Sequence, residues 1–199
     1  MLKTPKSLEA FKAVDRADFV LPEHLDVAYE NHPLPIGFGQ TISQPYTVAF
    51  MIDLLAPKAG EKILDIGCGS GWATALLSYL VGKKGKVIGI ERIPQLAEMA
   101  RENLSKYPKL QPVAKVLYGD GSKGFADEAP FDKIIAAATA EDISQEWKEQ
   151  LKVGGRIVAP MQDSIVVIDK LSSHEFKTIA HWGFVFVPLI RGSLHPSRP

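Results

Sequence analysis

The 199-residue sequence predicts an α/β fold built on a mostly parallel central sheet, with an antiparallel edge at its C-terminal end. From residue 57 onward, apolar runs of strand length alternate with segments of helical periodicity, which is typical of parallel βαβ units. One such run, residues 63–66, is followed by three alternating glycines and then by an Ala- and Leu-rich segment. The last two apolar runs, residues 164–168 and 184–187, are β-branched or aromatic, and we expect them to complete the sheet as antiparallel strands.

The composition is that of one globular domain. Hydrophobic residues make up 46% of the chain, and 23 basic residues balance 23 acidic ones. A chain without net charge argues against a large nucleic-acid footprint, so we predict no nucleic-acid partner. The single cysteine, Cys68, excludes an intrachain disulfide and favours a cytoplasmic protein. No apolar run approaches the ~20 residues of a membrane helix, so we predict no membrane partner.

The N-terminal third combines two helices with an irregular segment. Residues 7–16 have the spacing of an amphipathic helix that Ser7 could cap, and residues 45–55 predict a second helix that begins at Pro45. His24 and His32 lie in the irregular segment between them without a recognised metal-ligand spacing, so we predict loop histidines and no metal. His174, His181 and His195 fit no catalytic or metal pattern either.

Residues 63–80 carry the strongest local signal, namely a strand, a glycine turn and a helix. Glycines let a backbone approach a ligand closely, and a helix start offers free amide hydrogens. The spacing Gly67-x-Gly69-x-Gly71 differs from the dinucleotide pattern, which would require a glycine at Trp72. A tight turn without a ligand is the alternative, but the carboxylate of Asp65 at the strand end favours a binding site.

Further elements follow the order expected of the fold. Residues 86–90 predict a strand that ends at Glu91, about 20 residues past the glycine turn, where a carboxylate can accept hydrogen bonds from a ribose. An exposed strand-end glutamate is the alternative. A helix begins at Pro94, and residues 113–118 predict a strand that leads to Asp120. Residues 131–138 predict a strand, 143–151 a helix, and 151–158 a fifth strand.

The pattern Asp65-x-Gly67-x-Gly69-x-Gly71 resembles the first motif of the Rossmann-like S-adenosylmethionine-dependent methyltransferases. The resemblance implies helices on both faces of the sheet and S-adenosylmethionine as the cofactor, with S-adenosylhomocysteine as the product. It also implies that Asp120 accepts a hydrogen bond from the adenine amino group, whereas a turn-forming aspartate is the alternative. The predicted cofactor site comprises Asp65, Gly67, Cys68, Gly69, Ser70, Gly71, Glu91, Arg92, Asp120 and Gly121.

Residues 35–45, Pro-Ile-Gly-Phe-Gly-Gln-Thr-Ile-Ser-Gln-Pro, closely resemble the loop that marks the protein-L-isoaspartate (D-aspartate) O-methyltransferases. The resemblance extends over residues 18–190. It implies a protein-repair methyltransferase that methylates the α-carboxylate of L-isoaspartyl residues in damaged proteins and peptides. Ser43 matches the family's active-site serine, although capping of the next helix is its alternative role. The predicted substrate-binding residues are Gln40, Thr41, Ile42 and Ser43.

The implied reaction fits the residue types present. A carboxylate with a pKa near ~4 is ionised at neutral pH, so the reaction needs no general base and we predict no metal. We expect a single, monomeric methyltransferase domain in which residues 1–56 form an extension that carries the substrate loop and residues 57–199 form the cofactor-binding core. The alternatives are a methyltransferase that acts on a small molecule or RNA, and a non-catalytic protein that retains the cofactor fold.

Overall fold

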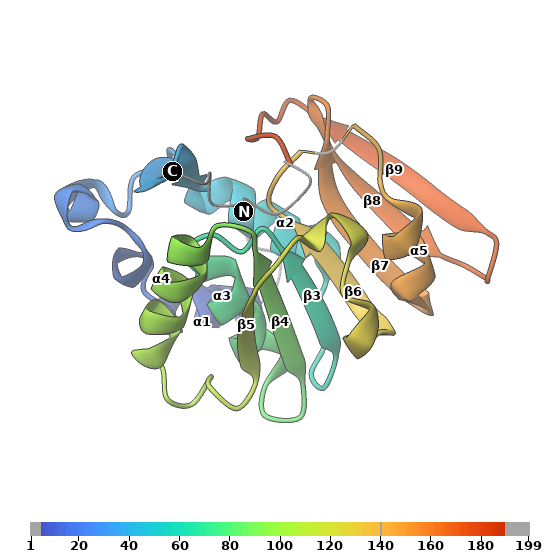
Figure 1. Cartoon of the computed structure of the whole chain (residues 1–199), viewed down its shortest axis with the longest axis horizontal. Helices are drawn as coiled ribbons and strands as arrows, with labels where there is room; N and C mark the ends of the chain where they lie inside the picture. Colours follow the sequence, from blue (N-terminus) through green and yellow to red (C-terminus); the bar gives the residue numbers. More distant parts are fainter. Residues whose placement is uncertain (1–4, 140, 190–199) are drawn as a thin grey trace, which may run out of the picture.

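The computed structural model describes residues 5–139 and 141–189, and a seven-stranded sheet forms its centre (Figure 1). Across the sheet the order is β5-β4-β3-β6-β7-β8-β9. The first five strands in this order are parallel, and β8 and β9 are antiparallel, which confirms the predicted fold class. The bounds are β3 Lys62–Ile66, β4 Lys86–Glu91, β5 Ala114–Tyr118, β6 Phe131–Ala136, β7 Leu151–Met161, β8 Ser164–Lys170 and β9 Phe176–Trp182.

Helices cover both faces of the sheet. Successive side chains of a strand point to opposite faces, so Ile63 joins one hydrophobic core and Leu64 the other. Four helices share the core of Ile63, and α5 packs in the core of Leu64. The helix bounds are α1 Pro5–Ala13, α2 Pro45–Leu55, α3 Trp72–Val81, α4 Pro94–Ser105 and α5 Gln145–Gln150; the 3-10 helices are η1 Arg16–Phe19, η2 Pro22–Val27, η3 Gly121–Lys123 and η4 Ala126–Glu128. No helix in the described residues combines the length and apolarity that a membrane span requires.

The segment that we expected to be a glycine-punctuated loop is a short antiparallel hairpin. Strands β1 Leu34–Gly37 and β2 Gln40–Ile42 pair with each other, separately from the main sheet. Their turn has positive φ at Gly37, Phe38 and Gly39, with values of 92°, 56° and 69°. Two glycines adopt this backbone conformation without strain, and they allow the tight reversal that places β2 ahead of α2.

Neither of the two serines considered as helix caps, Ser7 and Ser43, is an N-cap in the structure. Ser7 lies inside α1 and is buried, because the helix already begins at Pro5. The N-cap of α2 is Gln44 rather than Ser43, and its side chain makes no capping hydrogen bond. Instead, Oδ1 of Asn31 accepts a hydrogen bond from the backbone N of Tyr46 at 2.9 Å. The hydroxyl of Ser43 is therefore not used to cap the helix.

The predicted strand at residues 184–187 is also wrong. The last strand is β9, whose side chains are largely exposed on both faces and therefore show no apolar alternation. Gly183, with φ of 98°, turns the chain out of the sheet, so residues 184–187 are irregular. They continue toward the end of β6, where the backbone N of Thr139 donates to the carbonyl O of Val187 at 2.8 Å. His195 lies outside the described residues.

Candidate active site

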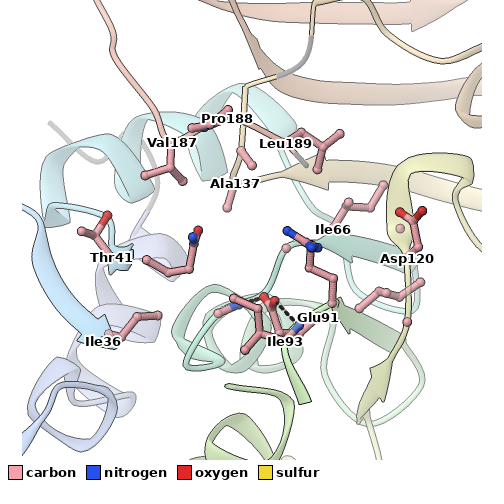
Figure 2. Close-up of a pocket in the computed structure, with 18 residues that line it drawn as sticks. Ile36, Thr41, Ile66, Glu91, Ile93, Asp120, Ala137, Val187, Pro188 and Leu189 are labelled. Atoms are coloured by element: carbon pink, nitrogen blue, oxygen red, sulfur yellow. Dashed lines mark hydrogen bonds between the residues drawn. The ribbon is translucent and has the colours of Figure 1, made fainter. Parts of the chain in front are cut away.

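Three hollows meet where β3, β4 and β6 end. The first cavity lies beside Glu91 and Asp120, and the second lies beside Asp65 and Ser43; each has a volume of about 60 Å³. A groove of about 490 Å³ runs between the segment from Thr41 to Thr47 and residues 183–187. Thr41 lines all three hollows, and so does Ala137, which lies across the site from the hairpin (Figure 2).

The glycine turn after β3 forms the floor of both cavities. The backbone N atoms of Gly67 and Cys68 donate to the carbonyl O of Ile90, which fastens the turn to β4. Gly67 and Gly69 line both cavities and have positive φ, so their missing side chains leave the backbone open to a ligand. Gly71 lines neither cavity; an added Cβ would lie 3.1 Å from Cβ of Ala100, so this glycine lets α4 pack closely.

Asp65 is a buried carboxylate with one unused oxygen. Its Oδ2 accepts a hydrogen bond from Oγ1 of Thr74 at 2.6 Å, whereas its buried Oδ1 has no hydrogen-bond partner among the described residues. Burial raises the pKa of Asp65 to about 6; the hydrogen bond from Thr74 opposes this rise, and the charge of Glu91 adds to it. Because Asp65 lines the second cavity, it is suited to bind a cationic group there.

Gly89, in the neighbouring strand β4, allows Thr74 and Cys68 to pack closely beside Asp65. A Cβ at this position would lie 2.9 Å from Oγ1 of Thr74 and 3.0 Å from Sγ of Cys68. The first distance is shorter than real Cβ contacts and the second is unusually short, so a side chain at residue 89 would force Thr74 or Cys68 to shift. Cys68 lines the second cavity as a buried thiol whose pKa is raised, first by burial and then by the charges of Asp65 and Glu91.

Glu91 joins the glycine turn to the start of α4. Its Oε2 accepts from the backbone N of Gly69 at 2.9 Å, and its Oε1 accepts from the backbone N of Ile93 at 3.0 Å (Figure 2). Each carboxylate oxygen can accept a further hydrogen bond, so Glu91 can still bind a ligand hydroxyl in the first cavity. Both predicted roles of Asp120 are compatible, because its Oδ1 accepts from the backbone N of Ser122 while the residue lines the first cavity.

Ser43 lies at the boundary between the second cavity and the groove. Its hydroxyl has no hydrogen-bond partner among the described residues, which leaves the group available to a ligand. Phe184 lines the groove and stacks on Phe50 with ring centroids 5.1 Å apart. None of the described residues that line the groove carries a charged side chain. The described lining of the groove is therefore uncharged, and it includes Thr41 and Ser43, which also line the second cavity.

The structure brings almost all of the predicted site residues together around Thr41, apart from Gly71. The predicted site residues did not include six apolar residues that reach the first cavity from the hairpin and from distant segments, namely Ile36, Ile93, Ala137, Val187, Pro188 and Leu189 (Figure 2). Composition and periodicity alone did not distinguish these residues from core residues. His32 is exposed and its Nε2 pairs with Oε2 of Glu30 at 3.0 Å, as expected of a loop histidine. The described residues contain no cluster of three or more potential metal ligands.

Comparison with known proteins agrees with this geometry. The family model for protein-L-isoaspartate(D-aspartate) O-methyltransferase matches residues 1–194. The protein-L-isoaspartate O-methyltransferase of Methanopyrus kandleri is 44% identical and covers 95% of this chain and 85% of its own. The protein-L-isoaspartate O-methyltransferase of Methanothrix thermoacetophila is 46% identical, and the match covers 92% of this chain and 87% of the relative. A Plasmodium falciparum structure described as this enzyme, in complex with S-adenosyl-L-homocysteine, shares the fold with a TM-score of 0.84 at 22% identity, covering 96% of this chain and 92% of its own.

Proposed function

The chain belongs to the protein-L-isoaspartate(D-aspartate) O-methyltransferase family, and we propose from this premise that it methylates the α-carboxylate of L-isoaspartyl residues in damaged proteins and peptides. One observation carries the proposal beyond the family match. Thr41 and Ala137 line both cavities of the glycine turn and also the groove, so a cofactor and a peptide can meet at one point. Ser43 lines both the second cavity and the groove, and its hydroxyl has no hydrogen-bond partner in the part of the chain that the structure describes.

S-adenosylmethionine, when bound, supplies a methyl group on a cationic sulfur that is electrophilic without a metal. The unused, buried Oδ1 of Asp65 would hold the cofactor's ammonium group. Trp72 and Ala73 line the same cavity at the start of α3, where free backbone amides and the helix dipole would hold its carboxylate. Glu91 would accept the ribose hydroxyls and Asp120 the adenine amino group. Cys68, Ser70, Arg92 and Gly121 complete the proposed lining.

In this proposal the protein positions a nucleophile that is already active. An α-carboxylate is ionised at neutral pH, so no residue has to remove a proton. The Ser43 hydroxyl would donate a hydrogen bond to one carboxylate oxygen and leave the other directed at the methyl carbon. Gln40, Thr41 and Ile42 in β2 would hold the isoaspartyl backbone. Because the described groove residues are uncharged, no cation would neutralise the carboxylate, and catalysis would come from proximity and the exclusion of water.

A methyltransferase that acts on RNA is disfavoured by the same groove. RNA binding requires cationic side chains along the phosphate path, and the described lining supplies none. We propose a monomer without a resident metal. In it, residues 1–56 carry the substrate loop and residues 57–199 hold the cofactor. We also propose a cytoplasmic location, since the one thiol, Cys68, is buried and unpaired, as suits a reducing compartment.

A paired-peptide assay tests the proposed function. One peptide carries L-isoaspartate and a second carries normal aspartate at the same position, and methyl transfer from labelled S-adenosylmethionine is measured. Base-labile label on the isoaspartyl peptide alone is the expected result. Ser43→Ala should lower kcat/KM by about ten- to a hundredfold, because a hydrogen bond to a charged group is worth about 1.5–3 kcal/mol.

Ser105→Ala is the matched control, since Ser105 is exposed at the end of α4 and, among the described residues, its hydroxyl donates only to the carbonyl O of Glu102 in its own helix. It should retain the wild-type rate. Equal labelling of both peptides would contradict the substrate assignment, and full activity of Ser43→Ala would contradict the role given to its hydroxyl.

A further inference from the structure

We infer that Arg16 is a positioning residue that holds Ser43 in place through the serine's backbone carbonyl. The inference rests on the proposed role of Ser43 and extends it to a side chain that touches neither cavity nor groove. Arg16 begins the 3-10 helix η1 and is only 3% exposed. Nothing in its sequence context distinguishes it from an ordinary charged residue at the end of a helical segment.

The guanidinium group joins two separate segments of backbone. Its Nη1 donates to the carbonyl O atoms of Ala28 at 2.5 Å and Glu30 at 3.4 Å. Its Nη2 donates to the carbonyl O of His32 at 3.1 Å and to that of Ser43 at 3.2 Å. Three of these carbonyls precede the hairpin of β1 and β2, and the fourth follows it. Arg16 therefore fastens both ends of the hairpin that carries the substrate loop.

Trp72, which lines the second cavity, also contacts the guanidinium group of Arg16. Cζ of Arg16 lies 5.5 Å from the ring centroid of Trp72, the first residue of α3 after the glycine turn. Phe11 packs edge-on against the same indole with centroids 5.4 Å apart. A planar guanidinium supported by an aromatic ring has little rotational freedom. The carbonyl of Ser43 is thus held in a fixed relation to the start of α3, beside the second cavity.

A lysine cannot reproduce this arrangement. Its single ammonium nitrogen cannot occupy the two positions that Nη1 and Nη2 of Arg16 fill, so at least one end of the hairpin would be released. A displacement of about 1 Å at a reacting group can cost about a hundredfold in rate. We expect Arg16→Lys to lower kcat/KM for the isoaspartyl peptide by about that factor. The Kd for S-adenosylhomocysteine should change less than about threefold.

Lys170→Gln is the matched control for lost stability. Lys170 is also buried, and its Nζ donates to the carbonyl O atoms of Lys148 and Leu151 at 2.7 Å each. Lys148 lies in α5, and Leu151 begins β7 beside the start of β6, at the opposite end of these parallel strands from the active site. The control should lower Tm but preserve kcat/KM. If Lys170→Gln lost as much kcat/KM as Arg16→Lys at an equal loss of Tm, the effect of Arg16 would be one of stability only.

The decisive measurement is a double-mutant cycle with Ser43→Ala. If Arg16 acts by positioning Ser43, removing the hydroxyl should cost at least tenfold in the wild type and less than about twofold in Arg16→Lys. An equal cost in both backgrounds would overturn the inference and leave the proposed role of Ser43 intact. No cost in either background would overturn both. Arg16→Gln, which buries no charge, takes the place of Arg16→Lys in the cycle if the lysine variant does not fold.

Discussion

Replacing Asp65 with asparagine should stabilise the cofactor-free protein at pH 8 while weakening its affinity for the cofactor. The carboxylate is fully buried, and its pKa of about 6 compares with an ordinary value of 3.8. This difference corresponds to about 3 kcal/mol by which folding is disfavoured when Asp65 is ionised. Asparagine removes the charge but leaves an amide with one partner missing, so we expect a net gain of about 1–2 kcal/mol. For a chain of this size, Tm should rise by about 2–8 °C.

The effect should have a defined pH dependence. The folded-state pKa of Asp65 lies above the unfolded value, so the folded protein binds the proton more tightly. The stability penalty is therefore largest above pH 6 and disappears as the pH falls through 6 toward 4. Thermal unfolding of the wild type and Asp65→Asn between pH 4 and pH 8 measures it. The advantage of the variant should shrink over that range.

Asp132→Asn serves as the control, because the pKa of Asp132 is lowered and the substitution should therefore change stability in the opposite direction. Burial alone would raise the pKa of Asp132, but hydrogen bonds from Nζ of Lys152 and the backbone N of Lys62 lower it. This variant should lower Tm at pH 8 and approach the wild type in acid. A fall in Tm of Asp65→Asn that is the same at pH 8 and pH 5 would refute the reasoning, because it would mean that the ionised carboxylate does not disfavour the fold.

The ligand side of the same prediction uses calorimetric titration. If the carboxylate of Asp65 holds an ammonium group, only its ionised form binds, and a pKa of about 6 leaves about one-tenth ionised at pH 5. The wild-type Kd for S-adenosylhomocysteine should therefore rise about tenfold from pH 8 to pH 5. Asp65→Asn should bind weakly with little dependence on pH. A wild-type Kd that does not change over this range would contradict the proposed contact.

Two further substitutions separate the cofactor side from the peptide side. Gly89→Ala should lower the free energy of unfolding by about 1–3 kcal/mol and weaken cofactor binding about tenfold, because the added Cβ would press on Thr74 and Cys68. If Tm and the cofactor Kd were unchanged, this position would not be crowded. Phe184→Ala removes the stack on Phe50 beside the groove, so it should raise the peptide KM by about two- to tenfold and leave the cofactor Kd unchanged. Steady-state kinetics measure the KM and calorimetric titration measures the Kd. An equal change in both constants would contradict a role specific to the groove.

Elements whose signal is local could be predicted from the sequence. The glycine turn follows its strand as expected. Helices α2 and α4 begin at Pro45 and Pro94, as predicted, because the first residue of a helix has no intrahelical use for the N–H that proline lacks. The apolar face of α4 consists of the buried residues Leu96, Ala97, Ala100 and Leu104. In each case, the residues that define the element lie within one or two turns of each other, so their spacing carries the information.

The edge of the sheet could not be predicted in the same way. Strand β9 has no buried face, so its hydrogen bonds to β8 are the reason that it forms, and these bonds have no sequence signature. The apolar residues 184–187 have the composition of a strand, but after Gly183 they line the groove instead. Composition cannot distinguish an apolar segment in a sheet from one that borders a ligand.

The candidate site likewise contains parts that local sequence signals predict and parts that depend on contacts between distant residues. The sequence by itself determined the strand, turn and helix around Gly67 and Gly69, and the resemblance of residues 35–45 marked Ser43. Only the tertiary structure decided that Asn31, rather than Ser43, caps α2, and that Arg16 holds the Ser43 carbonyl from 27 residues away. The physical reason is that backbone conformation depends on adjacent residues, whereas a buried hydrogen bond between distant residues exists only once packing has brought them together.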